Sequence, residues 1–279
     1  MDTAIVWLLN LLGDSGTSGT NDLLQLPQEY NAALYNAAID IHNAAVKPIT
    51  SIILSIMFVL MLATTSTRAE GDRELGVRII AATMFKIALV FIVAQNAVLI
   101  LDAISSIATS IATSANDVNV GGGGADAALG DELRDEVEDL SLTEKVVTIM
   151  LLIIPSLVSI IASVLVVVLV YIRFLQMYLM SAFASLPLAF LGHDETRSIG
   201  VGYLKAFAST ALTGTVIVIT VKMYQSLAGS FTSVGTFGDD DNFFDFILNA
   251  FSSFFIAPIV LIFLLFGANG LAKKVLGEA

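Results

Sequence analysis

The run from Val146 to Leu191 contains 46 residues and a single charged residue, Arg173. A helix needs about 20 apolar residues to cross the hydrocarbon core of a bilayer. The run is therefore too long for one simple crossing and about the right length for two. How often it crosses decides which ends of the chain lie on which side of a membrane.

Long apolar blocks dominate the rest of the chain as well. Of its 279 residues, 56% are hydrophobic and only 14% are charged, whereas a soluble domain is usually about 25% charged. The ten-residue alternation that is typical of transmembrane β-barrel strands is absent from the sequence. The sequence therefore predicts an all-α, polytopic membrane protein with about five transmembrane helices. The expected crossings lie at about 48–66, 78–101, 146–170, 203–227 and 246–268.

The distribution of Lys and Arg favours a single crossing within the run. Cytoplasmic segments of membrane proteins carry an excess of basic residues. One crossing gives five spans, with eight basic residues inside and three outside when the N-terminus lies outside. Two crossings give at best seven inside and four outside. We therefore expect a multi-pass protein of the cell membrane with its N-terminus outside and its C-terminus in the cytoplasm.

If the run crosses the membrane once, its second part, residues 174–191, belongs to none of the five predicted spans. This segment mixes aromatic and aliphatic residues with Ser181 and Ser185, and Pro187 precedes a polar turn. Irregular backbone at membrane depth requires protein or water around it. The segment either follows the inner surface, enters and leaves as a re-entrant segment, or forms a sixth span.

Negative charge is concentrated in the segments that this topology places outside. Residues 1–47, 102–145 and 229–245 have net charges of −4, −8 and −4, against −12 for the whole chain. The predicted layout is an outer N-terminal region (1–47), two spans (48–101), an acidic Gly-rich outer loop (102–145), a long third span with the inner-side or re-entrant segment (146–191), and two last spans (192–279) with an acidic outer loop (229–245) and a short inner tail.

The N-terminal region ends in a predicted amphipathic helix. Between Pro27 and Pro48, apolar residues recur at helical spacing. Such a helix ahead of the first span is expected to lie at the outer membrane interface. The residues of its apolar stripe are Tyr30, Leu34, Ala37, Ile41 and Ala44.

The acidic loop contains another predicted helix, because Leu133, Val137 and Leu140 fall at helical spacing. Ser141 then lies three residues before Glu144, which is the spacing of a capping box at a helix start. The dense acid is either a solvated loop or a docking surface for a basic partner. The candidate docking residues are Asp131, Glu132, Asp135, Glu136, Glu138 and Asp139.

No motif in the sequence indicates catalysis or a cofactor. The chain has no cysteine, and its two histidines, His42 and His193, belong to no metal-ligand spacing. The aspartates at 239–241 lack the distal glutamate of a calcium loop. The four glycines at 121–124 follow no strand and precede no lysine, so they form a linker. We therefore expect neither an enzyme nor a bound cofactor or metal.

Three basic residues lie inside or at the ends of the predicted spans, where ionisable groups usually face a cavity, a partner or an interface. Lys86 and Lys222 can extend to the inner and outer surfaces, respectively. Arg173 either extends to the inner headgroups or lines a pore or subunit contact. The candidate pore or subunit-contact residues are Arg173, Tyr178, Lys205 and Lys222.

Small residues recur every four positions on two predicted helices, which is a spacing that lets helices approach closely. Packing within the chain or between subunits is the expected use of both faces. The first face is formed by Ala206, Thr210 and Gly214, and the second by Ser106, Ser110 and Ser114.

The stretch Arg173–Tyr224 resembles a known family. An Arg that ends an apolar span is followed by an aromatic and small-residue segment, a Pro and a short polar turn. The pattern Ile-Gly-x-x-Tyr-Leu-Lys-x-Phe-Ala comes next, formed by Ile199, Gly200, Tyr203, Leu204, Lys205, Phe207 and Ala208. These features resemble the TrbL-type inner-membrane channel subunits of conjugative type IV secretion systems, in particular the shorter versions of Gram-positive conjugative elements.

The resemblance implies a non-catalytic scaffold and conduit for single-stranded DNA with its attached relaxase. It implies membrane lipid, secretion ATPases, subunits with outer domains and further copies of the chain as partners. A stand-alone small transporter or ion channel is the alternative. That class often shows inverted repeats, and the sequence contains no internal repeat.

Overall fold

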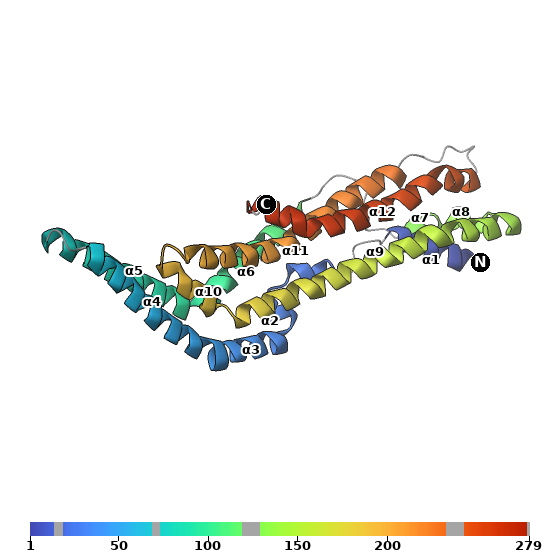
Figure 1. Cartoon of the computed structure of the whole chain (residues 1–279). Coiled ribbons are helices and arrows are strands. Elements are labelled where there is room, and N and C mark those ends of the chain that lie inside the picture. The colour runs from blue at the N-terminus through green and yellow to red at the C-terminus, as the bar shows by residue number, and fades with distance from the viewer. Residues whose placement is uncertain (14–18, 69–72, 119–128, 233–242, 278–279) are drawn as a thin grey trace. The chain divides into compact units, whose positions relative to one another are not determined.

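The structure is a computed structural model that describes residues 1–13, 19–68, 73–118, 129–232 and 243–277. All regular structure in these residues is helical, which confirms the predicted all-α class. The α-helices are α1 (Asp2–Gly13), α2 (Pro27–Tyr30), α3 (Ala32–Ile41), α4 (Lys47–Arg68), α5 (Arg73–Gln95), α6 (Ala97–Asp117), α7 (Leu129–Glu132), α8 (Arg134–Glu138), α9 (Leu142–Ala182), α10 (Ser185–Ala189), α11 (Arg197–Thr232) and α12 (Phe243–Val275). Figure 1 shows them, and two 3₁₀ segments, η1 (Asn21–Leu24) and η3 (Phe190–Gly192), and a π-helix, η2 (His42–Val46), complete the fold.

Six helices of the described residues are long and apolar enough to cross a membrane, where the sequence predicts about five. The additional one arises because the predicted second span, 78–101, divides into α5 and α6. The chain turns at Asn96, whose side-chain amide donates a hydrogen bond to the carbonyl of Ile92 at 2.8 Å. The six candidate spans are Ala32–Ser66, Val77–Gln95, Ala97–Asp117, Leu142–Ala182, Arg197–Ser226 and Phe254–Val275.

The long apolar run forms one continuous helix followed by a short reversal. α9 has 41 residues, which corresponds to about 60 Å at 1.5 Å per residue. Pro155 lies inside α9 without ending it. Residues 174–182 continue the helix, and α10 and η3 then pack against α4 and α5. The run therefore contains one candidate span and not two.

The chain divides into two compact units, and α6, α9 and α11 each contribute residues to both. Unit 1 comprises residues 1–24, 110–172 and 213–272, and unit 2 comprises residues 25–109, 173–212 and 273–279. Each unit has its own cluster of buried apolar side chains.

Unit 1 is built around its N-terminal helix. α1 contacts α7 and α8, and Ile5 and Leu9 are fully buried in a cluster with residues of α9 and α12. Val137 of α8 joins this cluster, in agreement with its predicted helical spacing. The capping box is confirmed: the Ser141 amide donates to Glu144 Oε2 at 2.9 Å, and Ser141 Oγ accepts from the Glu144 amide at 3.4 Å.

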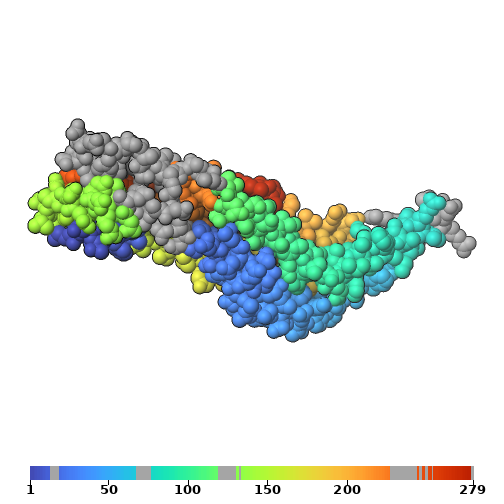
Figure 2. Space-filling model, turned by 180° about the vertical axis from the view of Figure 1, so that it is seen from behind, coloured from blue at the N-terminus to red at the C-terminus, as the bar shows by residue number. Residues whose placement is uncertain are grey.

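Unit 2 has its buried cluster where α6, α9, α10 and α11 meet. Leu101 of α6 packs there with Met177 of α9, Leu188 of α10 and Phe207 of α11. α4 and α5 lie side by side as a hairpin and contact α10 (Figure 1). In the space-filling view, α3, α4 and α5, coloured blue to cyan, form one continuous surface (Figure 2).

The predicted amphipathic helix forms as α2 and α3, but its apolar stripe faces outward. Leu34 is 49% exposed and Ile41 is 52% exposed. The inward side carries Ala38 and His42, which are buried, and Tyr35, which is half-buried. An outward apolar face suits a segment surrounded by lipid, where polar tips find partners within the protein.

Candidate functional site

Unit 2 contains a seam of aromatic and polar contacts between the segment from α2 to α4 and the segment from the end of α9 to α10. The seam begins with Tyr30, whose ring stacks on Phe174 at a centroid distance of 4.0 Å and an interplanar angle of 9°. Phe174 in turn lies 6.4 Å from the ring of Tyr178, one helical turn further along α9. Rings at such separations attract each other beyond the area that they bury.

Tyr178 and Tyr35 connect three parts of the chain through their hydroxyl groups. The Tyr178 hydroxyl donates to the carbonyl of Pro27 at 2.7 Å. Tyr35 contacts the Tyr178 ring edge-on at 6.4 Å. Its hydroxyl lies 2.8 and 3.0 Å from the two carboxylate oxygens of Asp102 on α6. This contact joins α3 to α6.

The seam continues along η2 and the start of α4. His42 is only 2% exposed, and its Nδ1 lies 3.3 Å from the carbonyl of Ala182, the last residue of α9. Thr50 and Ser185 share a hydroxyl–hydroxyl hydrogen bond of 2.8 Å. A single π-helical turn such as η2 often occurs at functional positions, and here it begins at the buried histidine.

Arg173 lies at the start of the unit 2 part of α9 and is only 2% exposed. Its Nη2 donates to the carbonyl of Ala211 at 3.2 Å, and its guanidinium carbon lies 4.9 Å from the centre of the Phe174 ring. Nε and Nη1 have no hydrogen-bond partner among the described residues. The guanidinium is thus held inside the chain by one carbonyl and one aromatic face, and does not extend to the surface.

The chemistry of this seam is suited to holding helices together. Its hydroxyls and its imidazole contact backbone carbonyls, a carboxylate or one another. Over the described residues there is no group of three or more His, Cys, Asp or Glu side chains that could hold a metal ion. The arrangement supports precise packing of α3, α6, α9 and α10.

The structure brings together two of the four candidate pore or contact residues. Arg173 and Tyr178 both contact Phe174 within the seam. Lys205 is exposed on α11. Lys222 belongs to unit 1, where its ammonium group donates to the carbonyl of Asn116 near the end of α6. A pore or subunit-contact role for the four residues stays a prediction.

The two faces of small residues differ in their surroundings. Gly214 is buried and Thr210 is half-buried, with its hydroxyl donating to the carbonyl of Ala206 at 3.0 Å. On α6, Ser106 and Ser110 are exposed. Among the described residues this serine face is exposed, and close packing against another subunit stays a prediction for it.

The candidate docking acids do not form one uniform surface. Asp131 accepts hydrogen bonds from Arg134 at 2.8 Å and from the side chain of Asn10 at 3.3 Å. The Arg134 guanidinium lowers the pKa of the Asp131 carboxyl below its ordinary value. Glu136 is half-buried, and the side chain of Glu132 lies outside the described part. Asp131 is exposed despite these bonds, and Asp135, Glu138 and Asp139 are exposed as well.

Sequence reasoning missed Tyr35, Asp102 and Phe174 as members of the seam. Tyr30 belongs to the predicted apolar stripe, and unlike the exposed Leu34 and Ile41 its ring packs on Phe174 of α9. The one available signal is Asp102 itself, the single charged residue between Lys86 and Asp117. An intramembrane carboxylate usually has a partner, but nothing in the sequence identifies a tyrosine 67 residues away.

Comparison with known proteins assigns the chain to a family. Residues 14–185 match the model of the TrbL/VirB6 plasmid conjugal transfer-like proteins. The chain belongs to this family. The match covers more than half of the chain and includes the whole seam from Pro27 to Ser185. No curated protein and no solved structure matches the chain significantly.

This result confirms the resemblance predicted from the sequence. The chain is a multi-pass membrane subunit of conjugal transfer, or type IV secretion, machinery, and it associates with the membrane and with other components of that machinery. Members of this family are structural subunits and belong to no known class of enzyme. The pattern at Ile199–Ala208 lies beyond the matched residues.

Proposed function

We propose that this chain is a non-catalytic channel subunit that forms, with further copies of itself, part of the conduit for single-stranded DNA and its attached relaxase. Membership of the TrbL/VirB6 family carries this proposal. Exposed apolar residues on α9, such as Met150, Ile161 and Val164, support it, because they leave a surface for lipid and neighbouring subunits. Separate ATPases would supply the energy.

The distribution of basic residues along the chain supports an orientation in the membrane. Residues 67–78, 192–205 and 269–279 together carry seven Lys or Arg residues, whereas residues 1–47, 102–145 and 229–245 together carry three. Basic residues are enriched on the cytoplasmic side of membrane proteins. The N-terminus of the chain then lies outside, and the turn at 193–196 and the C-terminal tail lie in the cytoplasm. This orientation requires an odd number of crossings, so it implies that not all of the six candidate spans cross the membrane.

The acidic segment is suited to docking basic outer domains of partner subunits. DNA is a polyanion and is attracted by basic surfaces, so an acidic outer segment is a poor site for DNA. The exposed residues Asp135, Glu138 and Asp139 are available to a partner, whereas Asp131 is already bonded to Asn10 and Arg134. Neutralising the three exposed acids should therefore weaken recovery of the complex. The matched control neutralises Asp40 and Glu195, which are exposed acids of unit 2.

The conduit is tested by cross-linking DNA to the chain in mating donor cells. Formaldehyde treatment, precipitation of the chain and amplification of the transferred strand should recover that strand only while the ATPases are active. The conduit role would be contradicted if the transferred strand were recovered with another subunit of the channel but not with this chain. Solute flux by the purified chain alone in liposomes would favour a stand-alone transporter.

The orientation is tested with single introduced cysteines, because the native chain has none. Asp135→Cys should react with a membrane-impermeant thiol reagent added to intact cells. Asp194→Cys and Lys274→Cys should react only after the membrane is permeabilised. Reaction of Asp194→Cys from outside would contradict the orientation and leave the family assignment unaffected.

A further inference from the structure

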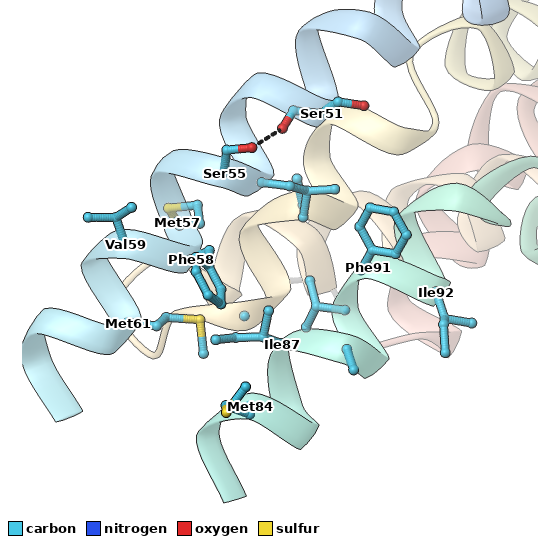
Figure 3. A pocket seen from close by; sticks show the side chains of 15 residues that line it. Ser51, Ser55, Met57, Phe58, Val59, Met61, Met84, Ile87, Phe91 and Ile92 are labelled. Carbon is cyan, nitrogen blue, oxygen red and sulfur yellow. Dashed lines mark hydrogen bonds between the residues drawn. The ribbon is translucent and has the colours of Figure 1, made fainter. Parts of the chain in front are cut away.

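Unit 2 contains a pocket of about 710 Å³ between the hairpin helices α4 and α5, with α10 and η3 as its floor. Figure 3 shows the side chains of Met57, Phe58 and Met61 on one wall and those of Met84 and Phe91 on the other. Both walls are candidate spans, so the pocket lies beside the hydrocarbon phase of the membrane. The residues that line the pocket determine which kind of ligand it can bind.

The lining offers no free polar group to a ligand. Its two serines donate their hydroxyls to their own helix, Ser51 to the carbonyl of Lys47 at 3.1 Å and Ser55 to the carbonyl of Ser51 at 2.9 Å. The remaining lining residues are apolar or glycine. A polar solute or a nucleic acid would lose its hydration there without compensation. The pocket therefore takes a hydrocarbon.

The shape of the pocket favours one flexible chain over a helix. α4 and α5 contact each other along the hairpin, and a helix with its side chains is about 10 Å across. The floor is tight, because a Cβ added at Gly192 would lie 3.1 Å from the sulfur of Met61. Met57 and Met61 are buried, and Met84 and Phe91 are exposed at the rim. Methionine side chains adapt to irregular apolar partners.

A polar pair borders the pocket and marks where a head group would lie. Lys86, between the lining residues Met84 and Ile87, pairs with Asp194 at 2.8 Å. Asp194 follows the lining residue Gly192 by two positions. The lysine side chain is 43% exposed and the aspartate 75%, so both charges remain accessible to water. From these contacts we propose that the pocket binds an acyl chain of a membrane phospholipid, with its head group next to the Lys86–Asp194 pair.

A pair of alanine substitutions on α5 tests this site. Ala88 lines the pocket, whereas Ala82 is exposed on the same helix outside the lining. Ala88→Phe fills the pocket, and Ala82→Phe adds the same ring elsewhere. The chain is reconstituted in vesicles of phosphatidylethanolamine and phosphatidylglycerol that contain a phosphatidylcholine with a photoactivatable acyl terminus. It is then extracted into detergent to remove surrounding lipid and irradiated.

Wild type and Ala82→Phe should carry cross-links in the peptides that contain Met57–Met61 and Met84–Ile92. Ala88→Phe should reduce them by at least about tenfold, since overpacking excludes the ligand. Met84→Ala enlarges the pocket and should retain labelling, provided that its helicity and elution volume match wild type. Equal labelling of the two Phe variants, or cross-links to a second copy of the chain, would overturn the lipid site. These results do not depend on DNA transport.

Discussion

The two parts of α9 belong to one helix but bury different kinds of side chain. Between residues 142 and 172, in unit 1, the buried positions include Thr148, Leu152, Ser156, Ser159, Ala162, Val166 and Val170. Between residues 173 and 182, in unit 2, they are Arg173, Phe174, Met177, Tyr178, Ser181 and Ala182. Apart from Lys145 near its start, the first part buries mainly aliphatic and hydroxyl-bearing side chains, whereas the second part also buries a guanidinium and two aromatic rings.

The polar groups of the two parts also bond differently. In the unit 1 part, the Ser156 hydroxyl donates at 2.7 Å to the carbonyl of Leu152 in its own helix, and its contact with Leu8 is longer, at 3.4 Å. In the unit 2 part, the Tyr178 hydroxyl donates at 2.7 Å to Pro27, 151 residues away. Apart from the Lys145–Asp2 ion pair near its start, the first part has its shortest side-chain hydrogen bond within its own helix, whereas the second part bonds to remote segments.

Removing the ring of Phe174, at the centre of the seam, should lower the free energy of unfolding more than any other substitution considered for α9. Phe174→Ala deletes the stacking partner of both Tyr30 and Tyr178 and leaves a cavity, which costs about 3 kcal/mol of unfolding free energy. Val166→Ala, a buried position of the unit 1 part, deletes about two methylene equivalents and should cost about 1.5 kcal/mol. Unfolding in detergent, followed by the loss of helical circular dichroism, measures both. Equal losses of unfolding free energy in the two variants would contradict the proposed difference between the two parts of α9.

Replacing the buried guanidinium separates stability from function. Arg173→Met keeps an unbranched side chain and removes the two nitrogens, Nε and Nη1, that lack partners in the described chain. A buried unsatisfied donor costs about 1–3 kcal/mol, so the isolated variant should be at least as stable as wild type. If Arg173 contacts a neighbouring subunit, DNA transfer should fall while the variant stays folded. A destabilised variant with normal transfer would show a purely structural arginine.

Sequence patterns predicted the helices of both parts but not which side of each helix is buried. The capping box at Ser141 and the packing of Val137 followed from local spacing. The outward stripe of α3, with Leu34 and Ile41 exposed, did not. In a membrane the solvent is as apolar as the core, so hydrophobic periodicity shows that a face exists without showing what covers it.

Contacts between remote segments could not be predicted from the sequence, for a second reason. Tyr35 and Asp102 meet only because α3 and α6 pack in unit 2, and no spacing rule relates residues on separate helices. The break at Asn96 was equally hidden, since α5 and α6 form one apolar stretch in the sequence. Local geometry was predictable, and the pairing of helices was not.

The hydroxyl groups of Tyr178 and Ser156 should also contribute differently to the free energy of unfolding, by a smaller amount. Tyr178→Phe removes the bond to the Pro27 carbonyl, which keeps only a longer bond of 3.4 Å from the Asn31 amide, and this loss should cost about 1 kcal/mol. Ser156→Ala removes a hydroxyl bonded mainly within its own turn, and an effect of about 0.5 kcal/mol or less is expected. The same unfolding assay measures both variants. A Ser156→Ala loss that exceeds the Tyr178→Phe loss would contradict the assignment of remote bonds to the unit 2 part.

Acid should weaken the contact between α1 and the unit 1 part of α9, and this is the smallest of the expected effects on stability. Lys145 near the start of α9 pairs with Asp2 of α1 at 2.8 Å, and this contact lowers the pKa of the Asp2 carboxyl. Because the folded-state pKa is lowered, the pair stabilises α1 above the ordinary Asp pKa and loses its effect as pH falls through the folded value. Trp7, the single tryptophan, lies on α1 and reports this change by fluorescence. The transition should lie below about pH 4 and disappear in Asp2→Asn, whereas an unchanged transition in that variant would assign it to other carboxylates.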